Sequence, residues 1–89
     1  MAGASITIIN RLGLHARAAA KFVNLAKTFQ SKVTLTKAGK SVDGKSIMNV
    51  MLLAAPVGTD IEIMVRGADE REAFMALVEL VNNRFGESD

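Results

Sequence analysis

The sequence contains no cysteine, a single histidine and only four aromatic residues, all of them phenylalanine. Without cysteine there is neither a disulfide framework nor a thiolate metal site, and one histidine argues against a histidine-based zinc site. We therefore expect no metal and no cofactor. No apolar run is long enough to span a bilayer and no signal-peptide pattern is present, so we expect a cytoplasmic protein that binds no membrane.

The composition is that of a small ordered domain. Of the 89 residues, 49% are apolar, which predicts one domain, residues 1–89, with an aliphatic core and no deep cavity. The functional site is therefore expected on the surface. The net charge of +2 favours acidic protein surfaces over nucleic acid as partners.

Apolar patterning predicts seven elements in the order βαββαβα. The predicted strands are residues 5–9, residues 32–37, a short strand ending at Val42, and residues 60–66. The predicted helices are residues 16–29, 47–53 and 69–85. Because each long strand is apolar on one face only, we expect an α/β (α+β) open-faced sandwich, a four-stranded, mainly antiparallel sheet covered on one face by three helices.

The last helix carries signals at both ends. Asp69, with Glu72 three residues later, predicts a capping box at its start, and Gly86 is expected to stop it. Residues 87–89 are expected to fray beyond it.

The candidate functional residue is His15, within Gly13-Leu14-His15-Ala16-Arg17. It lies where the first strand pattern gives way to a helix pattern, and the first backbone N–H groups of a helix can hold a phosphate or a carboxylate. Arg17 adds a guanidinium that can bind the same oxygens. The alternative is a histidine that caps the helix or is merely exposed. No second acid or base is predicted beside His15, which argues against an enzyme acting on its own.

The predicted helix at residues 47–53 is too apolar for its length, so part of its surface must be exposed. Ser46 before it is a predicted N-cap. Met48 and Met51 fit either a core or an adaptable docking surface, and the excess of apolar residues favours docking.

The chain resembles HPr, the histidine-containing phosphocarrier family of the bacterial phosphoenolpyruvate-dependent sugar phosphotransferase system. The resemblance is carried by two motifs at this separation, Gly13-Leu14-His15-Ala16-Arg17 after the first strand and Lys45-Ser46-Ile47-Met48 at the start of the short apolar helix. The resemblance extends over the whole chain and implies the fold expected above. It implies that His15 accepts a phosphoryl group on Nδ1 from enzyme I and passes it to a IIA component, and that Arg17 contacts the phosphoryl group. It also implies that Ser46 is phosphorylated by HPr kinase/phosphorylase with regulatory effect.

A docking face beside His15 follows from the same resemblance. Its expected residues are Leu14, Ala20, Lys21, Asn24, Lys27, Ile47, Met48 and Met51. The expected partners are enzyme I, the IIA component of a sugar permease, HPr kinase/phosphorylase and, as a further partner, a transcriptional regulator. We expect a monomer.

One residue departs from the family pattern, because Ala18 stands where the family usually has proline. The helix entry is then less constrained, although alanine favours a helix. A paralogous carrier in a regulatory or nitrogen-related phosphorelay is one alternative. A small RNA-binding domain is another, against which all four phenylalanines fall in predicted helices rather than on strand faces where bases stack.

Overall fold

The structure is a computed structural model describing residues 1–88, which form a four-stranded antiparallel sheet with helices on one face. The strands are β1 (Ala2–Thr7), β2 (Lys32–Lys37), β3 (Lys40–Asp43) and β4 (Asp60–Arg66). Their order across the sheet is β1-β4-β2-β3. Val33 pairs with Val65 and Leu35 with Ile63, and all four side chains are buried, as strand alternation predicts.

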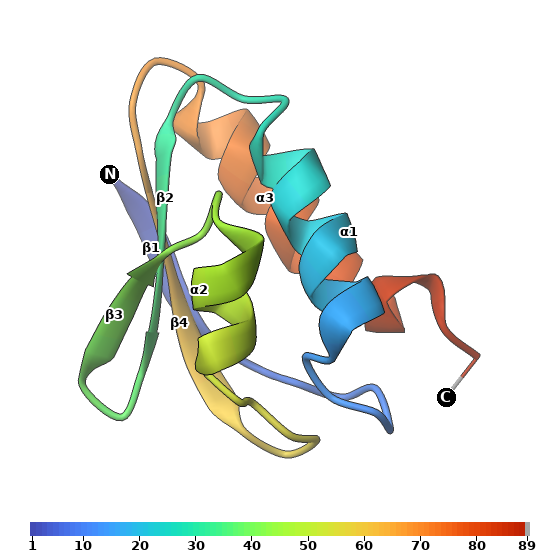
Figure 1. The fold of residues 1–89 in the computed structure, drawn as a ribbon. Coiled ribbons are helices and arrows are strands. Elements are labelled where there is room, and N and C mark those ends of the chain that lie inside the picture. The colour runs from blue at the N-terminus through green and yellow to red at the C-terminus, as the bar shows by residue number, and fades with distance from the viewer. Residues whose placement is uncertain (89) are drawn as a thin grey trace.

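The helices are α1 (Ala16–Ala26), α2 (Ile47–Leu52) and α3 (Glu70–Asn82), followed by the 3₁₀ turn η1 (Arg84–Gly86). Figure 1 shows α1 and α3 side by side over the sheet, with α2 beside α1. Phe22 of α1 and Leu77 of α3 are among the buried core residues between the layers. The predicted βαββαβα sandwich is therefore confirmed. No helix within residues 1–88 is long and apolar enough to cross a membrane.

The predicted bounds of β1 and α1 are wrong. β1 covers Ala2–Thr7 rather than residues 5–9, because its whole length pairs with β4, and Ile8 is buried just beyond it. α1 ends at Ala26, not at Phe29. The N–H of Phe29 bonds back to the carbonyl of Ala26 at 3.2 Å, a three-residue step that tightens the chain after the helix.

The predicted capping box at Asp69 is also wrong. Asp69 precedes α3, but its carboxylate makes no cap bond and instead accepts the N–H groups of Gln30 and Ser31, each at 2.9 Å, and the Ser31 hydroxyl at 2.5 Å. These bonds, above all the one from the Ser31 hydroxyl, lower the pKa of Asp69 below its usual value. Asp69 therefore ties the start of α3 to the loop after α1.

The C-terminus of the chain differs from expectation too. α3 ends at Asn82, because Arg84 and Phe85 adopt left-handed backbone angles, with φ of 54° and 53°. This turn returns the chain toward α1 and buries the Phe85 ring completely. The predicted fraying is wrong for Glu87, whose side chain is hydrogen-bonded, whereas Asp89 lies outside the described residues.

Candidate functional site

His15 ends a loop that the surrounding backbone holds in place. Gly13 in this loop has a φ of 69°, and a Cβ at this position would lie 2.7 Å from the carbonyl oxygen of Ala55 and 2.8 Å from Cα of Pro56. Glycine is therefore required here. The N–H of Leu14 donates to the carbonyl of Ala55 at 2.8 Å. The loop is thus attached to the segment after α2, which sets where α1 begins.

His15 is the N-cap of α1, so the capping interpretation of this residue is correct. Its Nδ1 accepts a hydrogen bond from the N–H of Arg17 at 3.3 Å, and its carbonyl accepts the N–H of Ala19 at 2.8 Å. Nδ1 consequently faces the positive end of the helix dipole. The cap role of His15 is compatible with anion binding at this site, because it places Nδ1 where an anion would be stabilised.

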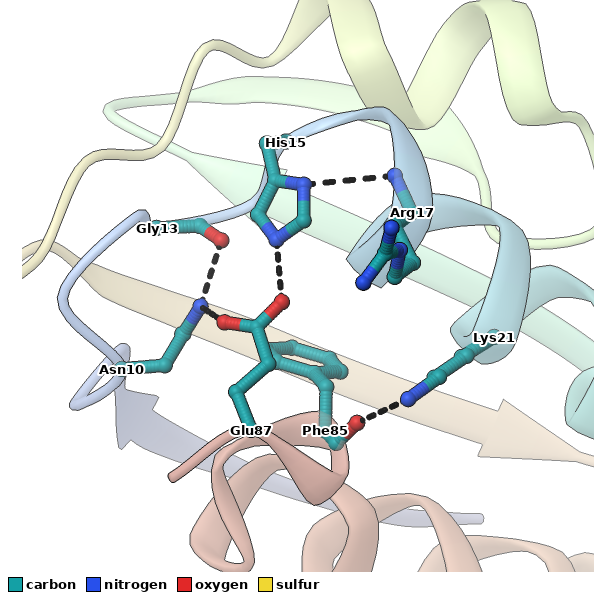
Figure 2. Close-up of polar contacts among 7 residues, drawn as sticks. All are labelled: Asn10, Gly13, His15, Arg17, Lys21, Phe85 and Glu87. Carbon is teal, nitrogen blue, oxygen red and sulfur yellow. Dashed lines mark hydrogen bonds and ion pairs between the residues drawn. The ribbon is translucent and has the colours of Figure 1, made fainter. Parts of the chain in front are cut away.

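Glu87 occupies the other side of the His15 ring, as Figure 2 shows. Its Oε2 contacts Nε2 of His15, and its Oε1 accepts the side-chain amide of Asn10 at 2.9 Å. Asn10 is fully buried and also donates to the carbonyl of Gly13 at 2.7 Å. The expectation that no second acid or base lies beside His15 is therefore wrong. Glu87 is 72 positions away in sequence, and no local pattern could have identified it.

The bonds at the two ring nitrogens fit one tautomer of His15. Nδ1 accepts from a backbone N–H, which requires a lone pair, and Nε2 faces a carboxylate, which requires a proton. Burial acts to raise the pKa of Glu87, but the hydrogen bonds from Asn10 and His15 outweigh it and leave that pKa below its usual value of 4.5. Glu87 is thus ionised at neutral pH.

Arg17 lies on the first turn of α1 beside the ring (Figure 2), and it is exposed. Together with Arg11, which the sequence analysis did not single out, it lines an open hollow of about 590 Å³ in front of His15 and Glu87. The hollow is therefore lined by two arginine side chains as well as by His15, a setting suited to phosphate oxygens. Ala18, at the position where proline was expected, is fully buried within α1, which forms without proline.

Ser46 is the predicted N-cap of α2, and the structure confirms this: its hydroxyl accepts the N–H of Asn49 at 3.4 Å. It lies far from His15 along α1. The ammonium of Lys45 donates to the carbonyl of Phe29, past the C-terminal end of α1, at 2.8 Å. Since α1 has 11 residues and is about 16 Å long, Ser46 and His15 lie near its opposite ends.

Most of the predicted docking residues are at the surface. The apolar α2 surface, defined as Ile47, Met48, Met51 and Leu52, is exposed, and Val50 is the buried side chain of this helix. Lys21, Asn24 and Lys27 are exposed on or just after α1, Ala20 is half-buried, and Lys21 donates to the carbonyl of Phe85 at 2.7 Å. Leu14 is a correction: it is 6% exposed and part of the core, because its position after Gly13 points it inward.

Comparison with known proteins agrees with this geometry. The family model for the phosphorylation site of the HPr component of the phosphotransferase system matches residues 3–83. Phosphocarrier protein HPr of Neisseria meningitidis serogroup A is 55% identical over 85 residues, 96% of each chain. A crystal structure of HPr-C-His from Thermoanaerobacter tengcongensis covers all of both chains at 43% identity, with a TM-score of 0.96.

A second crystal structure, of an HPr dimer from the same organism, is 44% identical, covers 98% of this chain and 100% of that one, and gives a TM-score of 0.79. Some HPr structures are therefore dimers, and the monomer expected for this chain stays a prediction. The full-length match in sequence, fold and His15 motif leads to one conclusion: this chain belongs to the HPr family, whose members are non-catalytic phosphoryl carriers of the phosphotransferase system.

Proposed function

We propose that Nδ1 of His15 accepts a phosphoryl group from phosphoenolpyruvate-charged enzyme I and passes it to a IIA component of a sugar permease. The observation that carries this proposal is the placement of Nδ1, with its lone pair, at the N-terminus of α1 beside Arg17. Both partners would place the protein in the cytoplasm.

The transfer needs little from this chain beyond position and positive charge. The Nδ1 lone pair attacks phosphorus, the bond to the donor's nitrogen breaks, and the electron pair leaves with that donor nitrogen. Backbone N–H groups at the start of α1 and the Arg17 guanidinium then face the equatorial oxygens. The exposed apolar α2 surface would contact each partner in turn, and its methionines suit a surface that must fit more than one protein.

Intact-mass analysis after incubation with phosphoenolpyruvate, magnesium and enzyme I of the same organism tests this function. We expect an acid-labile gain of one phosphoryl group in the wild type and none in His15→Ala. His15→Asn is a second control, because asparagine keeps an N-cap acceptor and so separates loss of the nucleophile from loss of the cap. No gain in the wild type, with enzyme I shown to phosphorylate itself, would contradict the proposal.

We further propose that a phosphate on Ser46, added by HPr kinase/phosphorylase, weakens docking and leaves the chemistry at His15 intact. The support is position: Ser46 starts the helix that bears the apolar α2 surface and lies at the end of α1 remote from His15. Nearly two negative charges there would repel acidic partner surfaces.

Ser46→Asp tests this regulation. Aspartate still caps α2, so the fold should be retained. We expect KM for transfer from enzyme I to rise about fivefold at low salt, to rise less at high salt because of screening, and kcat to change little. Ser41→Asp, which adds the same charge on the exposed strand β3, is the matched control. A fall in kcat without a change in KM would contradict the docking effect.

A further inference from the structure

The carboxylate of Glu87 uses its two oxygens for two different donors. Oε1 accepts the amide of the buried Asn10, and Oε2 faces Nε2 of His15. The Glu87 side chain is only 16% exposed and that of His15 is 27% exposed. Solvent therefore screens the electrostatic interaction between them only in part. The orientation of the carboxylate is therefore set by the protein, and it presents one oxygen to the ring.

The turn that carries Glu87 is held at several points. The buried Phe85 ring packs in the core, and the ammonium of Lys21 donates to the Phe85 carbonyl at 2.7 Å (Figure 2). The N–H of Glu87 donates to the carbonyl of Arg84 at 2.9 Å. Glu87 also lies beyond residues 3–83, which the family model matches. The contact with His15 is thus made by the C-terminal turn of the chain.

We propose that Glu87 is a positioning residue that holds the proton on Nε2 of His15, keeps the lone pair on Nδ1 and stabilises the ring while it accepts a phosphoryl group. The last part rests on the function proposed above. A carboxylate that orients a reacting histidine through its second nitrogen is a recurrent device in catalytic and metal sites.

The charge balance explains the expected benefit. When Nδ1 forms its bond to phosphorus, the proton stays on Nε2 and the ring becomes a cation. The Glu87 carboxylate then faces a full positive charge, and this interaction strengthens as the bond forms. Since the two nitrogens lie on opposite sides of the ring, the carboxylate meets the ring proton and not the phosphoryl oxygens. The charge of Lys21 also favours the ionised form of Glu87. Arg11 and Arg17 line the same hollow as Glu87.

Glu87→Gln gives a sharp test because Asn10 decides how the glutamine would lie. The Asn10 amide is a donor, so it selects the glutamine carbonyl and turns the glutamine NH₂ toward Nε2 of His15. That NH₂ can only donate, which favours the ring proton on Nδ1, at the expense of the 3.3 Å bond from the N–H of Arg17, and so occupies the nucleophilic nitrogen. Glu87→Ala removes both effects and leaves a mixture of tautomers in which the N–H of Arg17 still favours the Nε2–H form. Glu62→Gln, on the exposed sheet face away from the helices, is the matched charge control.

Two measurements on these variants decide the inference. The first is ¹⁵N–¹H NMR of the His15 ring in the free protein above pH 8, which also reports whether each variant is folded. We expect the Nε2–H form in the wild type and in Glu62→Gln, the Nδ1–H form in Glu87→Gln, and a mixture in Glu87→Ala. A wild-type pattern in both Glu87 variants would overturn the inference, and this readout needs no partner.

The second is the steady-state rate of phosphoryl transfer from enzyme I. We expect kcat to fall at least about 10-fold in Glu87→Gln, and less in Glu87→Ala, with KM unchanged because the apolar α2 surface is intact. Unchanged kcat in Glu87→Gln would overturn the role in transfer. Absence of transfer to the wild type would contradict the proposed function alone, since the NMR result still decides whether Glu87 sets the tautomer.

Discussion

Replacing Phe85 with alanine is expected to lower the free energy of unfolding by about 3–5 kcal/mol, measured by urea denaturation at neutral pH. The ring is fully buried, and the substitution leaves a cavity under the turn that follows α3. A domain of this size is stable by only about 5–15 kcal/mol, so the loss is a large part of the total. We also expect Glu87 to leave His15, because Phe85 anchors η1.

Met75→Ala is the matched control for this prediction. Met75 lies on α3, the helix before this turn, and it is 64% exposed. Its truncation is therefore expected to lower the free energy of unfolding by no more than about 0.5 kcal/mol. Similar losses for the two variants would show that burial of Phe85 does not anchor the turn. A loss confined to Phe85→Ala, together with a change in the His15 NMR signals, would connect the core to the site.

Gly13→Ala is expected to affect both stability and phosphoryl transfer. A Cβ at Gly13 would overlap the backbone of Ala55 and Pro56, and backbone cannot move aside as a flexible side chain can. Added to the left-handed φ of 69°, this overlap should cost about 2–4 kcal/mol in urea denaturation. The loop must shift, which displaces His15 from the start of α1, so we expect kcat for transfer to fall roughly 10-fold or more in the folded variant.

Gly39→Ala separates backbone strain from overlap. Gly39 also has a positive φ, 82°, but no atom lies within 4 Å of a Cβ built there. This variant should therefore show only the strain, about 1–2 kcal/mol, and normal transfer. If Gly13→Ala is no more destabilising than Gly39→Ala, the close approach of the Gly13 loop to residues 55–56 does not constrain the site.

The sheet and helices were predictable because their signals are local. Alternation in residues 32–37 and 60–66 places every second side chain on one face, and the structure buries Val33, Leu35, Ile61, Ile63 and Val65 there. The placement of His15 at a helix start was predictable for the same reason, since the loop, the histidine and the helix are contiguous. The Ser46 cap and the exposed apolar α2 surface were equally readable from neighbouring residues.

The predictions that were wrong concerned residues whose positions depend on contacts between segments distant in the sequence. The capping box at Asp69 fitted the local pattern, but the loop after α1 supplies three better donors to the same carboxylate. Leu14 looked like a surface residue of the motif, yet the bond from its N–H to the Ala55 carbonyl pins the loop and places its side chain in the core.

By itself, the sequence determined which residues form strands and helices, and it placed His15 at a helix N-terminus, because periodicity and capping act within a few residues. Only the tertiary structure decided what faces Nε2. Burial of Phe85 turns the chain back after α3, and that packing brings Glu87 to a histidine 72 positions earlier. No local pattern encodes this meeting, since it depends on how α1, α3 and the final turn pack together.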